Sequence, residues 1–426
     1  MKRLFYTLLF FLPCMLIACG GSDDTPDGDN NPPVVVPPDE EPVDSRLLYN
    51  GIRLPEQWPP VRSSSSELEK GMSPFYLSDK PSVINISVGR QLFVDNFLIE
   101  STNLKRTLYY PEYYSGNPIL TPEQDWEKTG TKGAAFAAPF SDGVWYDEKE
   151  GKYKMWYMAG GGSYATSGAG VTCYAESTDG IHWTKPTLSV VAGTNIVDYN
   201  SERDASVIWL DKQESNASKR YKMFLVARES GKWRYRYKTS PDGKVWRAAA
   251  QSEPIADRST VYKNPFRNVW VYSMRHNVRV DANKLVRARD YNENADPEVG
   301  TKKAEALLSA FWFGPWANEQ RHTDYPNIAP AIYNQDATPY ESIMLGFFSV
   351  WQGPENDVCA SDNVIKRNQV MVGYSRDGYS WFREDMNPFH AVNTTTSDAW
   401  NQGNLQSVAG ASPEPREVPE SLTGDA

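Results

Sequence analysis

One short turn occurs three times in the chain, and it constrains the fold more than any other feature. The copies read Ser177-Thr-Asp-Gly-Ile-His-Trp183, Ser240-Pro-Asp-Gly-Lys-Val-Trp246 and Ser375-Arg-Asp-Gly-Tyr-Ser-Trp381, so the common pattern is Ser-x-Asp-Gly-x-x-Trp. Asp-Gly favours a tight turn, because glycine accepts a positive φ and aspartate bonds nearby backbone groups. We expect the Trp that ends each copy to pack against the next sheet.

The spacing of these copies predicts a repeat with one degenerate member. The third copy starts about twice as far from the second as the second does from the first. Four similar hairpins follow the same period, at 143–157, 206–226, 261–272 and 331–348. The third has no such turn and is expected to carry a short helix at 302–311. Repeats of about 65 residues with mostly β content are typical of radially arranged four-stranded sheets.

Segments before and after these hairpins suggest a further sheet. Strands are expected at 84–86, 91–99 and 104–110, and the segment 400–408 follows the last hairpin. In propellers, the first and last strands commonly share one sheet, which removes an open edge. We therefore predict an all-β, five-bladed β-propeller over residues 80–410, with an incomplete last blade and a disordered tail at 411–426.

The N-terminal residues predict an exported lipoprotein. Lys2 and Arg3 precede an apolar run at 4–17 that is too short for a permanent membrane helix. Leu16-Ile-Ala-Cys19 resembles a bacterial lipobox, in which the cysteine is lipidated. We predict a signal peptide at 1–19, a disordered Pro/Asp/Gly-rich linker at 20–48, and anchoring through Cys19 to the outer membrane or cell surface.

Composition excludes some partners and favours others. The net charge of −10 argues against nucleic acid, whose binding proteins need a basic face. Four histidines and no Cys-x-x-Cys make a zinc site improbable, and no cofactor is predicted. Cys173 and Cys359 are expected to be buried apolar side chains, although a disulfide between them stays open. The aromatic content of 13% suits both strands and sugar stacking. Five tryptophans are expected in the sheet core: Trp145, Trp156, Trp209, Trp270 and Trp351.

A five-bladed propeller with Trp- and Tyr-rich hairpins resembles the furanosidase superfamily of glycoside hydrolases, which includes invertase-like β-fructosidases, arabinanases, β-xylosidases and mannoside phosphorylases. Gln91-Leu-Phe-Val-Asp-Asn-Phe-Leu-Ile-Glu100 also resembles a set of bacterial family 32-like glycosyl hydrolases. The resemblance covers roughly residues 85–409. It implies a carbohydrate substrate and a funnel in which carboxylates from different blades meet.

Three acidic residues are the catalytic candidates under this resemblance. Arg203-Asp204-Ala205 is similar to the Arg-Asp-Pro motif, whose Asp binds substrate hydroxyls and stabilises the transition state, and Arg203 is expected to orient Asp204. Pro339-Tyr-Glu341-Ser implies that Glu341 is the general acid at a strand start. The family's nucleophile or base falls nearest to Asp142, although the expected Asn-Asp-Pro-Asn-Gly is absent.

Other residues are candidates for the same funnel. Asp95 is an alternative to Asp142, and a buried structural role for it is left open. Asp257-Arg258 opens the third unit and repeats the acid–arginine pairing. Arg275-His276 is a candidate for binding substrate carboxylate or hydroxyl groups, with a core or rim role as the alternative.

These observations predict a glycoside hydrolase that uses paired carboxylates, one as proton donor and one as nucleophile or base. The alternative is a non-catalytic glycan-binding surface lipoprotein, which the missing Asn-Asp-Pro motif and the short last blade favour. A sialidase-like enzyme is a third hypothesis, because the repeated turn is similar to the sialidase Asp box. That box is a structural turn, however, and the sequence contains no convincing arginine triad.

Overall fold

The computed structural model describes residues 44–128, 135–165, 170–199, 202–280, 284–389, 391–393 and 399–410. Contacts divide the chain into the units Met1–Asp44 and Ser45–Ala426. The predicted signal peptide with Cys19, most of the predicted linker and the predicted tail therefore lie outside the described residues. Within the described ranges, no helix is long and apolar enough to cross a membrane.

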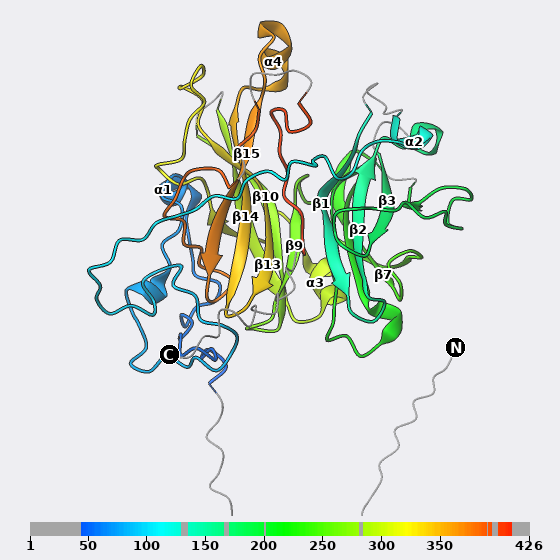
Figure 1. The fold of residues 1–426 in the computed structure, drawn as a ribbon. Helices are drawn as coiled ribbons and strands as arrows, with labels where there is room; N and C mark the ends of the chain where they lie inside the picture. The colour runs from blue at the N-terminus through cyan, green and yellow to red at the C-terminus, as the bar shows by residue number, and fades with distance from the viewer. Residues whose placement is uncertain are drawn as a thin grey trace, which may run out of the picture. The chain divides into compact units, whose positions relative to one another are not determined.

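The strands form four antiparallel sheets in the part of the chain that the structure describes (Figure 1). The first sheet contains β1 (Ala137–Asp147), β2 (Lys152–Ala159), β3 (Val171–Ser177) and β4 (Ile196–Asp198); the second contains β5 (Glu202–Leu210), β6 (Tyr221–Glu229), β7 (Lys232–Ser240) and β8 (Arg247–Gln251). The third contains β9 (Thr260–Asn264), β10 (Val269–Arg279), β11 (Leu285–Asn294) and β12 (Ala310–Phe313); the fourth contains β13 (Ala331–Tyr340), β14 (Ile343–Gly353) and β15 (Arg367–Ser375). All four predicted hairpins are confirmed.

Short helices lie before the first strand and in the connections between strands. They are α1 (Ser64–Glu67), α2 (Asp125–Lys128), α3 (Pro297–Lys303) and α4 (Asn356–Asp362), with 3-10 turns η1 (Phe75–Leu77), η2 (Gly162–Tyr164) and η3 (Ala217–Lys219).

The first strands of the four sheets lie side by side around a common axis. β1 contacts β5, β5 contacts β9, and β9 contacts β13. The Ser141 hydroxyl on β1 donates to Asp336 on β13 at 2.9 Å, so the first and fourth sheets also meet. This radial order confirms the predicted all-β propeller arrangement.

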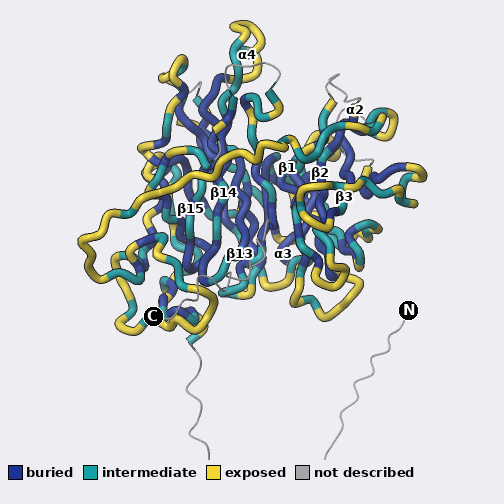
Figure 2. The backbone as a smooth tube through the Cα atoms, in the orientation of Figure 1, coloured by how far each residue is buried: buried dark blue, intermediate teal, exposed yellow. Residues whose placement is uncertain are grey.

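The core lies between the faces of neighbouring sheets (Figure 2). Residues 221–227 of β6 are all buried, because both faces of that sheet are covered. The five tryptophans that were predicted to be core are buried. Two pairs of them join successive sheets, with ring centroids 4.7 Å apart for Trp145–Trp209 and 5.9 Å apart for Trp209–Trp270.

The three copies of the repeated turn have the same hydrogen bonds. In each, the serine hydroxyl donates to the aspartate Oδ1 at 2.9 Å, and that oxygen accepts two backbone N–H groups further along. The glycines have positive φ, for example +73° at Gly378. The turns also join neighbouring sheets, since Trp156 donates to the Gly243 carbonyl and Tyr262 to the Gly378 carbonyl.

The degenerate fourth copy lies at the end of β11. Asp296 Oδ1 accepts the N–H groups of Glu298 and Val299 at 2.7 and 2.9 Å, as the aspartates of the other copies do. Asn294 stands in place of the serine and Pro297 in place of the glycine. Because an aspartate cap followed by proline starts a helix, α3 begins here. The helix predicted at 302–311 is therefore wrong in its position.

The fifth sheet does not form among the described residues. Residues 84–110 contain no strand, so the three strands predicted there are wrong. Residues 399–410 make only isolated bridges, which pair Val408 with Ser141, Asn404 with Asn368 and Gln402 with Asn393. Some apolar residues of the N-terminal segment pack instead into a cluster of their own, where Phe97 contacts Tyr76, and others, such as Phe93 and Leu104, are exposed. Figure 2 shows the exposed segment that leads from this cluster to α2.

The structure also differs from the predicted end of the linker, the predicted start of the packed unit and the predicted burial of Cys359. Leu48, Ile52 and Leu54 are buried in the N-terminal cluster, so the packed unit starts at Ser45 instead of residue 80, and the linker predicted to reach residue 48 is too long. Cys173 is buried as expected. Cys359 on α4 is half-buried, and both thiols are free.

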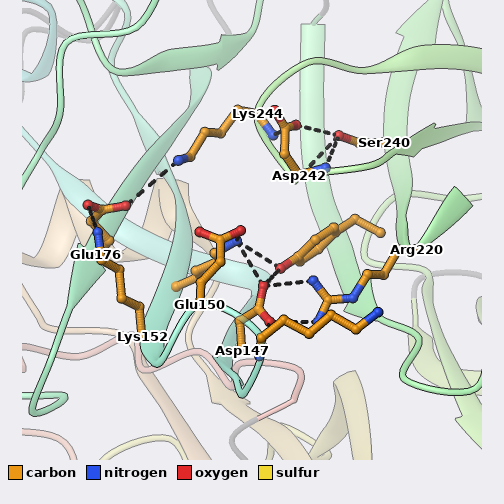
Figure 3. Close-up of polar contacts among 12 residues, drawn as sticks. Asp147, Glu150, Lys152, Glu176, Arg220, Ser240, Asp242 and Lys244 are labelled. Atoms are coloured by element: carbon orange, nitrogen blue, oxygen red, sulfur yellow. Dashed lines mark hydrogen bonds and ion pairs between the residues drawn. The ribbon is translucent and has the colours of Figure 1, made fainter. Parts of the chain in front are cut away.

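A buried ionic network joins the first two sheets at the far ends of their hairpins (Figure 3). Asp147 lies 2.6 Å from Arg220 and 3.0 Å from Lys154, which also binds Glu150 at 2.6 Å. The hydroxyl of Tyr221 donates to Asp147. We call these five residues the lateral network. Burial opposes ionisation of Asp147, but its hydrogen bonds outweigh burial and hold its pKa well below the usual range.

Candidate active site

Three of the four innermost strands are interrupted by a bulge on the propeller axis. Pairing of β1 with β2 shifts between Ala138 and Gly143, and pairing of β5 with β6 shifts between Arg203 and Ser206. Pairing of β13 with β14 shifts around Tyr333. Because a bulge frees residues from the ladder and re-aims their side chains, these positions supply some of the axial side chains, among them Asp204 and Tyr333.

Arg258 occupies the centre of this region, directly before β9. Its backbone φ is +57°, and its side chain is fully buried. The guanidinium lies 3.7 Å from the ring centre of Phe140 and 5.1 Å from that of Tyr333. Its backbone N–H donates to Asp204 at 2.7 Å, and its Nη2 donates to Gln406. Arg258 thus connects all four sheets.

Some side-chain N–H groups of Arg258 have no hydrogen-bond acceptor. Its Nε and Nη1 are buried without a hydrogen-bond partner, and Nη1 lies 3.7 Å from Asp204 Oδ1, beyond hydrogen-bond distance. A buried donor without an acceptor costs about 1–3 kcal/mol, more when it is charged. Such an arrangement leaves room for an acceptor oxygen from a water, an ion or a ligand.

Two partly exposed carboxylates flank Arg258. The side chain of Asp204 is 18% exposed and that of Asp257 is 29% exposed. Asp257 forms an ion pair with Arg275 at 2.7 Å. Burial raises the pKa of Asp257; Arg275 opposes this shift, and the nearby charge of Asp204 adds to it.

Arg287 and Tyr333 complete this group, with the Arg287 guanidinium 5.5 Å from the Tyr333 ring centre. We call six residues the axial cluster: Asp204, Asp257, Arg258, Arg275, Arg287 and Tyr333. They come from the second, third and fourth sheets.

Asp142 and Arg203 lie next to the cluster but pair with each other. Arg203 Nη2 binds Asp142 at 2.9 Å, and Nη1 binds Thr172 at 2.7 Å. The expectation that the Arg203 guanidinium orients the carboxylate of Asp204 is therefore wrong, because neighbouring side chains of a strand point to opposite sides. Asp142 is fully buried, with its second oxygen bound by the Phe140 N–H at 2.8 Å. Burial raises its pKa, which Arg203 opposes.

Sequence reasoning missed two buried charged residues beside the axis, which do not pair with each other. Asp336 on β13 accepts hydrogen bonds from Ser141 and Ser407 at 2.9 and 2.5 Å, and burial raises its pKa to about 6. Arg289 on β11 is also buried, and it donates to the Arg258 carbonyl at 2.9 Å. The polar run at 334–336 inside an apolar strand was the available signal.

Arg275 and His276 separate, as neighbours on a strand must. Arg275 faces Asp257, whereas His276 Nδ1 pairs with Asp290 at 2.9 Å on the other side. This contact with Asp290 raises the pKa of His276. Only Arg275 joins the axial cluster.

A groove of about 400 Å3 opens beside the axial cluster. Its lining includes Arg275 and Arg287 from the third sheet, and Trp351 from the fourth. Leu285, Ile328 and Ala329 add apolar surface, and Asn277, Lys284, Asn327 and Glu355 add polar groups. A groove with apolar surface and several convergent polar groups is the usual form of a small-ligand site.

Two candidate acids lie away from the axis. Glu341 is in the turn between β13 and β14, so the predicted strand start is wrong; it pairs with Arg90 at 2.7 Å, and that contact lowers its pKa. Asp95 is fully buried and binds Arg376 of the third repeated turn at 2.8 Å. It links the N-terminal segment to the fourth sheet, so Asp95 has the buried structural role that the sequence left open.

Among the residues described, no group of three or more His, Cys, Asp and Glu side chains is placed to hold a metal ion.

No family model matches the sequence, and no curated protein matches it. The structure is similar to a candidate glycoside hydrolase from Parabacteroides distasonis (13% identity, TM-score 0.42, covering 70% of this chain and 89% of that one). It is also similar to a structure from the GH130 family of mannoside phosphorylases, which contains glycoside hydrolases that target β-1,2-mannosidic linkages in Candida mannan. The identity is 13% and the TM-score 0.40, and the match covers 72% of this chain and 90% of that one.

A fructofuranosidase variant from Schwanniomyces occidentalis, solved with fructosylnystose, is a third similar structure (13% identity, TM-score 0.38, 63% of this chain). This chain covers 47% of that protein. At such TM-scores these likenesses assign no activity.

Proposed function

We propose that this chain is a glycoside hydrolase whose two working carboxylates are Asp204 and Asp257. The observation that carries the proposal is the axial cluster itself. Two partly exposed acids from neighbouring sheets flank a buried arginine with unpartnered N–H groups, beside a groove. Two carboxylates across a sugar are the usual machinery for cleaving a glycosidic bond.

The surroundings of the two acids support different roles. Asp257 is the proton donor in this proposal, because burial raises its pKa and keeps a proton available closer to neutral pH. Asp204 faces the anomeric carbon as the second carboxylate, with its Oδ1 fixed by the Arg258 N–H at 2.7 Å. Asp142 is fully buried and acts here as a positioning residue that holds Arg203.

Turnover of a panel of aryl glycosides, furanosides and pyranosides, tests the proposal. Asp204→Asn and Asp257→Asn should each lower kcat by about 10²- to 10⁴-fold, the range for losing a positioned acid or base. Asp125→Asn is the matched control, because its side chain is fully exposed on α2. Wild-type-like turnover in both site variants would remove the assignment.

A second candidate function is glycan binding without cleavage. Of the three acids that the sequence predicted to be catalytic, Asp142 is fully buried and Glu341 lies off the axis. Under this alternative, wild-type protein binds oligosaccharides on a glycan array but releases no product from any of them. Product release from any array member decides for the enzyme.

We further propose that Cys19 carries a lipid that holds the protein on the cell surface or outer membrane. The Leu16-Ile-Ala-Cys19 sequence is the support for this. Fractionation of cells that express wild type or Cys19→Ser, combined with labelling by a fatty-acid analogue, tests it. Equal labelling and equal membrane recovery of both proteins would refute the anchor.

A further inference from the structure

We infer that the groove beside the axial cluster binds an anionic group of the glycan, either a carboxylate or a sulfate ester. This inference rests on the proposed function, in that it takes the axial cluster to be a glycan site. It goes beyond that function because it names the chemical class of the substrate.

The charge of the groove is the first observation. Among the residues that the structure describes, Arg275, Lys284 and Arg287 line it together with one acidic side chain, Glu355. The whole chain carries a net charge of −10, so this positive lining is local. Asp257 lies 2.7 Å from Arg275 and neutralises its charge only when it is ionised. Glu355 is 56% exposed and stands 3.6 Å from Arg287, so it compensates Arg287 only weakly.

Unsatisfied donors are the second observation. The Nε atoms of Arg275 and Arg287 are buried and have no hydrogen-bond partner. Arg258, also in the axial cluster, has two more such atoms. Buried guanidinium N–H groups require acceptor oxygens, and the planar guanidinium fork fits the oxygens of a carboxylate or sulfate.

The strand register places these donors on one face. Arg275 pairs with Arg289 and Asn277 pairs with Arg287 across β10 and β11. Because side chains at alternate positions share a face, all four point to the same side of the third sheet. Arg275 and Arg287 are then diagonal neighbours, so one anion can contact both.

The surroundings of Arg287 hold it ready for such a contact. Its guanidinium lies 5.3 Å from the Trp351 ring centre and 5.5 Å from that of Tyr333. Aromatic rings on its flanks restrict its rotamers, which lowers the entropy lost on binding. The apolar groove residues, including Leu285 and Ile328, suit the carbon face of a sugar ring.

Calorimetric binding of matched glycan pairs tests the inference. The probes are oligogalacturonate against its methyl-esterified form, and a sulfated galactan oligosaccharide against its unsulfated form. The wild type should bind at least one anionic member about tenfold or more tightly than its neutral partner, as expected for charge-assisted hydrogen bonds. The pair that shows this preference identifies the carboxylate or the sulfate as the anion.

Variants locate the preference in the groove. Arg287→Gln should reduce it about tenfold, whereas Arg247→Gln, a change at an exposed position on β8, should leave it intact. Thermal unfolding of both variants checks that they fold. Lys284→Gln is the second variant if Arg287→Gln is unstable.

The outcomes separate this inference from the proposed function. Equal binding of charged and neutral members by wild type, or an intact preference in the folded groove variant, overturns the inference even if neutral glycosides are hydrolysed. A charge preference without hydrolysis supports the inference and overturns only the hydrolase.

Discussion

The axial cluster and the lateral network both bury arginine beside aspartate, yet they differ in how fully these groups are paired. In the lateral network, Arg220 makes two bonds to Asp147, and Lys154 binds Asp147, Glu150 and Tyr221. None of the polar atoms of these five side chains is buried without a partner. In the axial cluster, three arginines keep buried N–H groups without acceptors.

The difference teaches how to tell a clamp from a binding site. A buried ionic network that satisfies itself needs nothing from outside and joins two sheets (Figure 3). One that leaves donors unsatisfied beside a groove has room for a partner's oxygens. The comparison therefore predicts that substitutions in the axial cluster lower kcat, and that substitutions in the lateral network lower the free energy of unfolding.

Replacing Asp257, the proposed proton donor of the axial cluster, should give the largest effect. Asp257→Asn is expected to lower kcat by about 10²- to 10⁴-fold, because the proton donor is lost. Its free energy of unfolding should change by about 1 kcal/mol or less, since the side chain is partly exposed. Turnover and urea unfolding of the same preparation measure both quantities. A large loss of stability with normal turnover would reverse the comparison.

Removing the central carboxylate of the lateral network should give the opposite result. Asp147→Asn leaves Arg220 and Lys154 buried without their main partner, which costs about 3–5 kcal/mol of stability. Turnover per folded molecule should stay at the wild-type level. Urea unfolding monitored by tryptophan fluorescence measures the loss. A variant as stable as wild type would show that the network is not a clamp.

The pH dependence of stability should differ in sign between the two regions. The pKa of Asp336, beside the axial cluster, is raised to about 6, so its contribution is present below about pH 4 and is lost as pH rises through 6. The pKa of Asp147 is lowered, so its contribution is present above about pH 4 and is lost only in stronger acid.

Asp336→Asn isolates the first of these effects. Relative to wild type, the variant should gain on the order of 2 kcal/mol of stability between pH 4.5 and 7.5, because about 1.5 pH units of this window lie below the raised pKa of about 6 and each unit corresponds to about 1.4 kcal/mol. Urea midpoints of both proteins at the two pH values measure it. A gain in the reverse direction would contradict the raised pKa.

The smallest effect is expected at Glu341, which belongs to neither region. Its ion pair with Arg90 is at the surface, where Arg90 is 54% exposed. Glu341→Gln should therefore leave kcat unchanged and shift the melting temperature by about 2 °C or less. A loss of turnover comparable to that of Asp257→Asn would restore Glu341 as the acid and set aside the axial assignment.

Local chemistry made much of the fold predictable. The Ser-x-Asp-Gly turn carries its own hydrogen bonds within a few residues, so its three copies and the hairpins around them follow from the sequence. The degenerate copy was predicted from spacing, but its residues were not identified, because Asn294 and Pro297 replace the serine and glycine. The strands expected at 84–110 failed for a different reason. Phe97 packs into the N-terminal cluster with Ile84 and Leu98 beside it, while most other apolar side chains of this range are exposed, and apolar content alone does not distinguish this from a strand.

The site depended on contacts between distant parts of the chain. The sequence by itself marked Asp204, Asp257, Arg258 and Arg275 as acids and arginines at the edges of repeats, because a repeat places equivalent strand starts near one axis. Only the tertiary structure showed that Arg203 pairs with Asp142 and that Asp204 accepts the N–H group of Arg258. Only the tertiary structure placed Glu341 in the turn between β13 and β14, away from the axis. The bulges in β1 and β5 are the physical reason for the partners of Arg203 and Asp204. One extra residue in a strand reverses which side chains face the axis, and its cost and benefit depend on the neighbouring sheets rather than on adjacent residues.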